Sequence, residues 1–151
     1  MLDRVDQAIV EALLEDSRMP LKELAQRAGL SSPGVSERLR RLEERHVIRR
    51  YTVEVNPVAL GYPLQALVRI RPLPGRLQSL EARLKDIPQL AECDKVTGED
   101  CFIARLHLRS IEQLDDILGR IADEAETTTS IVKTQVVPRR APPVGVQQPS
   151  R

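Results

Sequence analysis

The segment from residue 32 to residue 41 gathers side chains with which proteins recognise nucleic acid. Val35, Leu39 and Leu42 recur at spacings of four and three, which predicts one apolar helix face turned inward. A helix fits the major groove of DNA, where Arg and Ser donors reach base edges. The candidate DNA-contacting residues on and beside this helix are Ser31, Ser32, Pro33, Ser36, Glu37, Arg38, Arg40 and Arg41.

Charge is divided unevenly within the first 50 residues. Residues 3–23 hold six acidic and three basic side chains, a net of −3, whereas residues 36–50 hold six basic and three acidic ones, a net of +3. A basic helix in front of an acidic one suits a polyanionic partner. The alternative is a solvated helix whose arginines pair with Glu37, Glu43 and Glu44. Arg49, next to Arg50, is either a further phosphate contact or part of an exposed edge.

Two earlier helices are expected to position this one. Asp3 is suited to cap a helix that runs to Leu14, and a second helix runs from Pro20 to Ala28. Gly29 then provides a left-handed stop before the third helix, which matches helix-turn-helix spacing. Residues 47–55 alternate with period two and predict a short strand pair, a wing. Residues 1–55 therefore form the predicted winged DNA-binding domain.

A second domain is expected after a linker over residues 56–63, which contains Asn56-Pro57 and Gly61. The patterns predict strand 64–71, helix 77–87, a hairpin of 90–96 with 101–108, helix 111–125 and strand 127–137. This order is the βαββαβ, or ferredoxin-like, arrangement, so the fold class is α+β, with the second domain at 64–137. Residues 138–151 contain four prolines and little apolar pattern, which favours a flexible tail.

The hairpin turn carries groups suited to an amino acid. Gly98 permits close backbone approach, and turn amides can hold a carboxylate. Glu99 or Asp100 can face an ammonium group, and hydroxyls follow at the last strand in Thr128, Thr129 and Ser130. A plain turn with a polar tip remains the alternative.

A four-stranded sheet with both helices on one face leaves its other face open. Both faces of strand 64–71 and strand 101–108 carry apolar residues, so we expect the open face to pack on a second copy. A homodimer also suits a helix-turn-helix, because two such helices meet two half-sites one DNA turn apart.

Composition and residue spacing exclude several other classes of protein. The 151-residue chain has no apolar run of membrane-spanning length, and its N-terminus, charged from Asp3, does not resemble a secretion signal, so we expect no membrane partner and a cytoplasmic location. Cys93 and Cys101 are too few for a zinc site, and His46 and His107 lack ligand spacing, so no metal is expected. With no nucleophile–base arrangement and no phosphate-binding Gly loop, we expect neither an enzyme nor a cofactor.

The order of short motifs resembles the Lrp/AsnC, or feast/famine, transcription regulators over residues 2 to about 137. The matching segments are Leu2-Asp3-x-x-Asp6, Gly29-Leu30-Ser31, Val35-x-x-Arg38-Leu39, Asn56-Pro57, Val96-Thr97-Gly98-Glu99-Asp100 and Thr128-Thr129-Ser130. The resemblance implies a DNA-binding domain joined to an amino-acid-sensing domain, dimers that assemble further, often to octamers, and an effector loop at Thr97 to Asp100. His46 stands where the family usually has Gly, and Cys101 where many members have Asp.

The leading hypothesis is a sequence-specific transcription regulator that binds double-stranded DNA and responds to an amino acid or a related metabolite. One alternative is a DNA-organising protein with little ligand response. A second is a metabolic enzyme or enzyme accessory whose ferredoxin-like domain binds amino acids.

Overall fold

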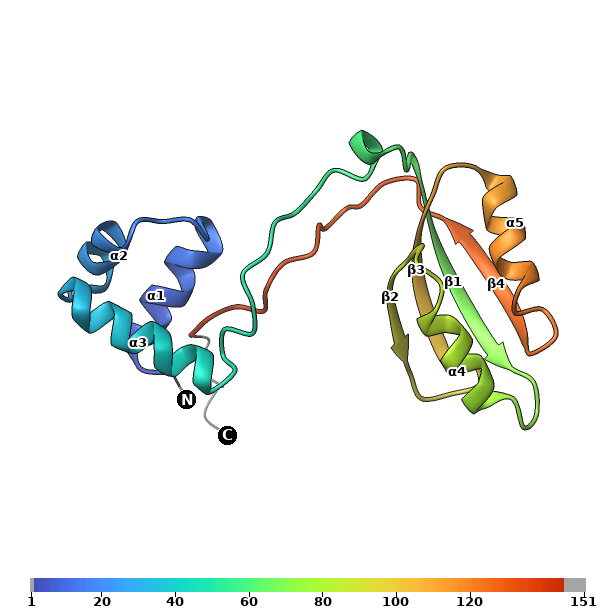
Figure 1. Ribbon diagram of the computed structural model, residues 1–151, viewed down its shortest axis with the longest axis horizontal. Coiled ribbons are helices and arrows are strands. Elements are labelled where there is room, and N and C mark those ends of the chain that lie inside the picture. Colours follow the sequence, from blue (N-terminus) through green and yellow to red (C-terminus); the bar gives the residue numbers. More distant parts are fainter. Residues whose placement is uncertain (1, 146–151) are drawn as a thin grey trace. The chain divides into compact units, whose positions relative to one another are not determined.

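The computed structural model describes residues 2–145, which divide into two compact units (Figure 1). The first contains the chain up to Glu54 together with the C-terminal segment from Pro138, and the second runs from Val55 to Val137. The boundary between residues 54 and 55 lies one residue before the predicted end of the first domain, and the predicted linker over residues 56–63 falls within the second unit. No helix in the described chain is long and apolar enough to cross a membrane.

The first unit contains three helices, α1 (Arg4–Glu15), α2 (Leu21–Ala28) and α3 (Ser32–Glu44). The Asp3 carboxylate caps α1 by accepting the Asp6 amide at 2.8 Å, as predicted. Gly29 ends α2 at φ +66°, and Ser31 caps α3 by accepting the Gly34 amide at 3.3 Å. These local signals confirm the helix-turn-helix prediction.

Burial between the three helices fixes their arrangement. Ile9 of α1, Leu24 of α2 and Val35 of α3 are almost completely buried and meet in one core. Leu42 is buried near the end of α3 and joins the same core. The polar side of α3 consequently remains at the surface.

The predicted wing is not formed. Residues 46–57 contain no strand or helix, and Val53 is 79% exposed. The alternating pattern was correctly identified, but a strand requires a partner strand, and no other part of residues 2–145 pairs with this segment. His46, which follows the end of α3, has φ +55°, the left-handed conformation expected at a position usually occupied by Gly.

The second unit confirms the βαββαβ order. A single 3-10 turn (Val58–Leu60) precedes β1 (Leu64–Pro72), and the remaining elements are α4 (Leu77–Lys85), β2 (Leu90–Lys95), β3 (Phe102–Leu108), α5 (Ile111–Gly119) and β4 (Ala125–Ile131). The antiparallel sheet has the strand order β2-β3-β1-β4. The helix predicted to reach Ala125 ends at Gly119, because turns over residues 120–124 lead into β4.

Both helices of this unit cover one face of the sheet. Val68 of β1 and Ala104 of β3 are fully buried beneath Leu80 of α4 and Ile117 of α5. The intervening strand residues face the opposite side, which neither α4 nor α5 covers. This open face is where the hairpin turn and β4 bring their polar groups.

The C-terminal segment over residues 138–145 contains no helix or strand. Residues from Pro138 cluster with the first unit, and Arg139, Arg140 and Ala141 line a hollow beside α1. The rest of the predicted tail, residues 146–151, lies outside the described residues.

Candidate functional site

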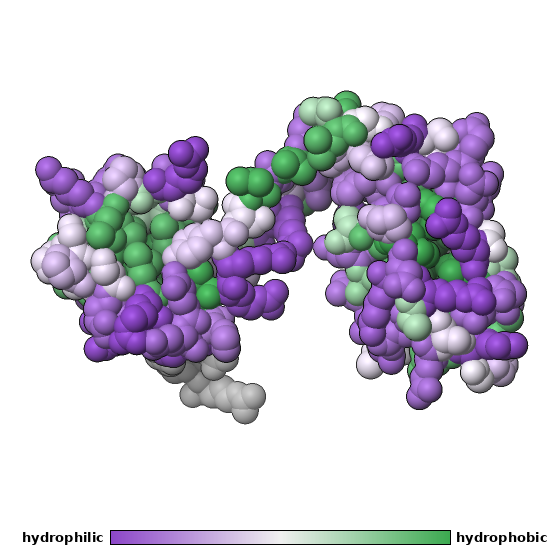
Figure 2. Space-filling view, viewed as in Figure 1, coloured by the Kyte–Doolittle hydropathy of each residue, from purple (hydrophilic) through white to green (hydrophobic). Residues whose placement is uncertain are grey.

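The outer side of α3 carries the candidate nucleic-acid interface. Ser36, Arg40 and Arg41 are exposed there, opposite the buried Val35 and Leu42. Figure 2 shows hydrophilic residues over this helix. Of the other candidates, Pro33 and Ser31 are exposed at the helix start, where the Ser31 hydroxyl already accepts a backbone amide, and Ser32 is half-buried.

The arginines on this surface pair with acidic residues of the same helix. Glu37 binds Arg40 at 2.7 Å and Arg41 at 3.0 Å, and Arg40 also contacts Glu44. The hydrogen bond from Arg40, with a second from Arg41, lowers the pKa of Glu37 to about 2, and the same pairing raises the pKa of Arg40. The alternative of a self-paired solvated face is therefore present in the structure.

These pairs do not prevent contact with DNA. The side chains of Arg40 and Arg41 are 56% and 61% exposed, so water and salt screen their pairing with Glu37. A phosphate offers the same charge and better bidentate geometry to a guanidinium. Arg40 and Arg41 can thus exchange an intrahelical partner for an external anion.

Arg38 is placed differently from the other arginines of α3. Its guanidinium donates to the carboxylates of Asp3 and, at 3.0 Å, of Asp6. Asp6 is only 6% exposed and also lies 3.8 Å from Arg45. The Asp6 backbone amide and then Arg38 lower the pKa of Asp3, and these carboxylates raise the pKa of Arg38. The structure thus directs Arg38 to α1, where it ties the two helices together, instead of directing it outward.

The hairpin turn brings the second group of candidates to the open face of the sheet. Gly98 has φ +111°, a conformation that favours glycine, and the Val96 amide donates to the Cys101 carbonyl at 2.8 Å to close the turn. Thr97 and Glu99 are exposed at the tip, and Asp100 is half-buried. The thiol of Cys101 contacts the Gly98 carbonyl at 3.7 Å, so it stabilises the turn.

Two arginines of β1 meet the acidic residues of this turn. Arg71 lies 2.9 Å from Glu99, 3.7 Å from Asp100 and 3.8 Å from Glu126 of β4. Arg69 lies 3.9 Å from Asp100. We call these five side chains the Arg71 cluster. The cluster places arginines, which can bind the carboxylate of an α-amino acid, next to acidic side chains, which can bind its ammonium group.

The register of β4 separates the three predicted hydroxyl residues. Thr128 pairs with Arg69 and Ser130 with Leu67, so both lie on the open face with the Arg71 cluster. Thr129 pairs with the buried Val68 and lies on the face that the helices cover. Thr129 is therefore not brought to the other candidates, because successive strand residues point to opposite faces.

Sequence reasoning missed Arg69 and Arg71 as site residues. Their spacing of two indicates that they share a strand face, a usable signal. Which acidic residues they meet depends on the pairing of β1 with both β3 and β4. The acidic partners of Arg69 and Arg71 could therefore not be predicted from the sequence.

Apart from the contact of the Cys101 thiol with the Gly98 carbonyl, no hydrogen bond or ion pair among the described residues joins a cysteine or histidine side chain to either group. Cys93 faces Ala104 across the hairpin, as expected for thiols that are not opposite one another, and both cysteines are free. Within residues 2–145, no group of three or more His, Cys, Asp or Glu side chains could hold a metal ion.

A helix-turn-helix unit followed by a βαββαβ unit with paired charges defines the class of ligand-responsive DNA-binding regulators. An AsnC-type helix-turn-helix domain matches residues 2–43, and an Lrp/AsnC ligand-binding domain matches residues 65–142. The chain is 40% identical over 129 residues to the HTH-type transcriptional regulator LrpA of Mycobacterium tuberculosis, covering 85% of this chain and 86% of LrpA. The chain belongs to the Lrp/AsnC family.

Solved structures agree with this assignment. Bacillus subtilis LrpC superposes with a TM-score of 0.86 at 28% identity and covers 92% of this chain and 99% of its own. The feast or famine regulatory protein of M. tuberculosis, complexed with L-methionine, superposes with a TM-score of 0.86 at 37% identity and covers 93% of this chain and 98% of its own. The described fold is thus the α+β ferredoxin-like fold with an N-terminal helix-turn-helix.

Proposed function

We propose that this chain is a transcription regulator that reads duplex DNA with the outer side of α3. The observation that supports this most directly is the exposure of Ser36, Arg40 and Arg41 opposite a fully buried stripe. Ser36 and the arginines supply donors for base edges and phosphates, while Ser31, Ser32 and Pro33 lie at the helix start, where backbone amides favour phosphate. Glu37 competes for the arginines, and Arg38 positions α3 on α1.

The Arg71 cluster is the proposed effector site. A free α-amino acid carries one carboxylate for Arg69 or Arg71 and one ammonium for Glu99, Asp100 or Glu126. The L-methionine complex of the M. tuberculosis relative supports this class of ligand. Thr97, Gly98, Thr128 and Ser130 surround the cluster and offer polar groups to the rest of the molecule.

We also propose that two copies pair through the open face of the sheet and assemble further, towards an octamer, in the cytoplasm. Leu67 and Ile103 give this face apolar area, and Arg105 is held on it at 2.9 Å from Glu92 and 3.1 Å from Gln65. A second copy would cover the otherwise open Arg71 cluster. An effector bound there would shift the assembly equilibrium if it binds one assembly state better than another.

The DNA assignment is tested by selecting bound sequences from random duplexes and footprinting the selected DNA. We expect protection confined to phased half-sites, and loss of that protection in the Arg40→Ala/Arg41→Ala double variant. The Arg76→Ala/Arg120→Ala variant, which removes two exposed arginines of the second unit, should protect normally. Protection that ignores sequence would favour the DNA-organising alternative, and unchanged protection by the α3 variant would contradict the proposal.

The effector assignment is tested by thermal shift with the twenty amino acids. A ligand that binds only the folded state raises the midpoint, and the rise grows with the logarithm of its concentration above the dissociation constant. We expect a response to at least one amino acid, which Arg71→Ala reduces and Arg76→Ala retains. No response from any amino acid would contradict an amino-acid effector.

A further inference from the structure

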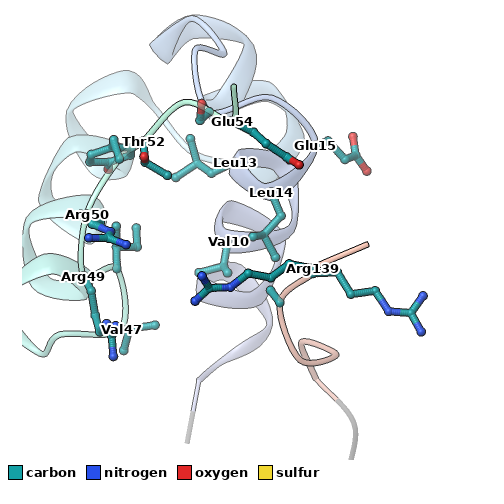
Figure 3. Close-up of a pocket in the computed structure, with 15 residues that line it drawn as sticks. Val10, Leu13, Leu14, Glu15, Val47, Arg49, Arg50, Thr52, Glu54 and Arg139 are labelled. Carbon is teal, nitrogen blue, oxygen red and sulfur yellow. The ribbon is translucent and has the colours of Figure 1, made fainter. Parts of the chain in front are cut away.

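An open hollow of about 760 Å³ lies on the first unit, between α1 and the segments that follow α3 and precede the C-terminus (Figure 3). Its apolar floor includes Val10 and Leu14 of α1 and Val47 of the segment that follows α3. Two stretches of chain about ninety residues apart in sequence form its rim. One is residues 47–54, and the other is residues 139–141 from the C-terminal segment.

The rim is rich in arginine. Arg49 and Arg50 come from one stretch and Arg139 and Arg140 from the other, and Figure 3 shows Arg139 beside Val10, across the hollow from Arg49 and Arg50. Glu15 and Glu54 are the acidic lining residues, but Glu15 is already paired with Arg27 at 2.5 Å. The rim therefore holds an excess of positive charge.

Both stretches contact the body of the unit. The Tyr51 hydroxyl donates to Glu43 of α3 at 2.9 Å, and the Ile48 amide donates to the Leu42 carbonyl at 3.1 Å. At the other stretch, Gly145 lies so close to Gln7 of α1 that a Cβ there would be 2.7 Å from the side-chain oxygen. The segment that carries Arg49 and Arg50 is thus held to α3 by the residues on either side of them, and Gly145 of the C-terminal segment lies against α1.

The geometry points to a second phosphate-binding surface, in which Arg49, Arg50, Arg139 and Arg140 hold the backbone of a DNA duplex engaged by α3. The inference rests on the proposed DNA-binding function and extends it to a segment outside the helix-turn-helix. A guanidinium that forms no ion pair within its own chain is available to bind phosphate. Within residues 2–145, neither Arg49 nor Arg50 forms an ion pair. Because the rim is open, it fits an extended polyanion better than an enclosed small anion.

The test measures how salt weakens binding to a mixed-sequence DNA duplex, because phosphate contacts do not depend on base sequence. Each lost phosphate contact lowers the slope of log affinity against log salt by about 0.9, so Arg139→Ala/Arg140→Ala should lower it by about 1.8. Over a fourfold rise in salt, the wild-type chain should lose roughly tenfold more affinity than this variant. Fluorescence anisotropy of a labelled duplex gives both slopes.

Matched variants separate the arginines from the rest of the segment. A chain that ends at Val137 should reproduce the reduced slope, whereas a chain that ends at Gly145 keeps both arginines and should match the wild type. Arg76→Ala/Arg120→Ala removes the same charge from the second unit and should leave the slope unchanged. Circular dichroism checks that each variant retains its helices.

Three results would contradict either the second phosphate-binding surface or the proposed DNA-binding function on which it rests. If the wild-type chain binds no duplex at low salt, the proposed function itself fails. If it binds but Arg139→Ala/Arg140→Ala keeps the wild-type slope, the second surface is wrong. If the slope is unchanged while inorganic phosphate raises the melting temperature of the wild type and not of the variant, the hollow holds a free anion instead.

Discussion

Each unit contains an arginine that pairs with acidic residues far from it in the sequence. The two clusters differ in how deeply the acidic side chains are buried. In the first unit, Arg38 meets Asp3 and Asp6, and Asp6 is 6% exposed. In the second, Arg71 meets Glu99, Asp100 and Glu126, whose side chains are 37–83% exposed. A buried carboxylate needs its partner for the unit to fold, whereas an exposed one can exchange that partner for a ligand. Similar chemistry therefore supports the fold in one unit and is available for binding in the other.

The strongest test of this difference removes one carboxylate from each cluster. Asp6→Ala should reduce the stability of the first unit by about 1–3 kcal/mol, because it leaves two arginines without their buried partner. Asp100→Ala should change stability by less than about 0.5 kcal/mol, as expected for a surface substitution. Urea unfolding followed by circular dichroism measures both. Equal losses would contradict the distinction, and Glu11→Ala, an exposed position on α1, provides the control.

For amino-acid binding, we expect the larger effect from a substitution in the second unit. Arg71→Ala should weaken amino-acid binding by about 10- to 100-fold, the effect of losing one charge-assisted hydrogen bond, without changing the melting temperature of the free protein. Arg38→Ala should leave amino-acid affinity within about twofold, because its cluster belongs to the other unit. Calorimetric titration with the amino acid that gives the largest thermal shift decides this. A comparable loss in both variants would show that Arg71 has no special role.

Two helix caps of matching geometry allow a finer comparison. Ser31 accepts the Gly34 amide at the start of α3, and Ser110 accepts the Gln113 amide at the start of α5, each at 3.3 Å. Ser31→Ala and Ser110→Ala should each cost about 1 kcal/mol of stability. Only Ser31→Ala should also reduce DNA affinity, measured at a temperature where both variants are folded. Equal DNA affinity in the two variants would restrict Ser31 to capping.

The smallest expected effect concerns pH and the exposed pairs of α3. Arg40 and then Arg41 lower the pKa of Glu37 from 4.5 to about 2 in the folded chain. Because the folded value is the lower one, this pairing stabilises the protein fully above pH 4.5 and is lost as pH falls toward 2. Glu37→Gln should therefore flatten the decline in melting temperature between these pH values slightly, since solvent screens the pair. An identical decline in the wild type and the variant would show that the pairing contributes nothing to stability.

Sequence reasoning was most successful where a signal is local. The cap at Asp3, the left-handed Gly29 and the βαββαβ order of the second unit were all predicted and confirmed. It failed at residues 47–55, where the period-two pattern was real but no strand pairs with it. No sequence signal indicated that residues 138–145 lie with the first unit.

The sequence by itself determined the order of the helices and of the βαββαβ strands, because helix and strand periodicity, caps and turns depend on residues only a few positions apart. The class of regulator came from the order of short motifs that resemble the Lrp/AsnC family. Only the tertiary structure decided that Arg38 faces α1, that Arg71 meets three acidic side chains, and that Arg139 joins the rim containing Arg49. Those pairings depend on strand register and on the path of the chain between distant segments. No local pattern specifies either one, since many registers and paths satisfy the same local preferences.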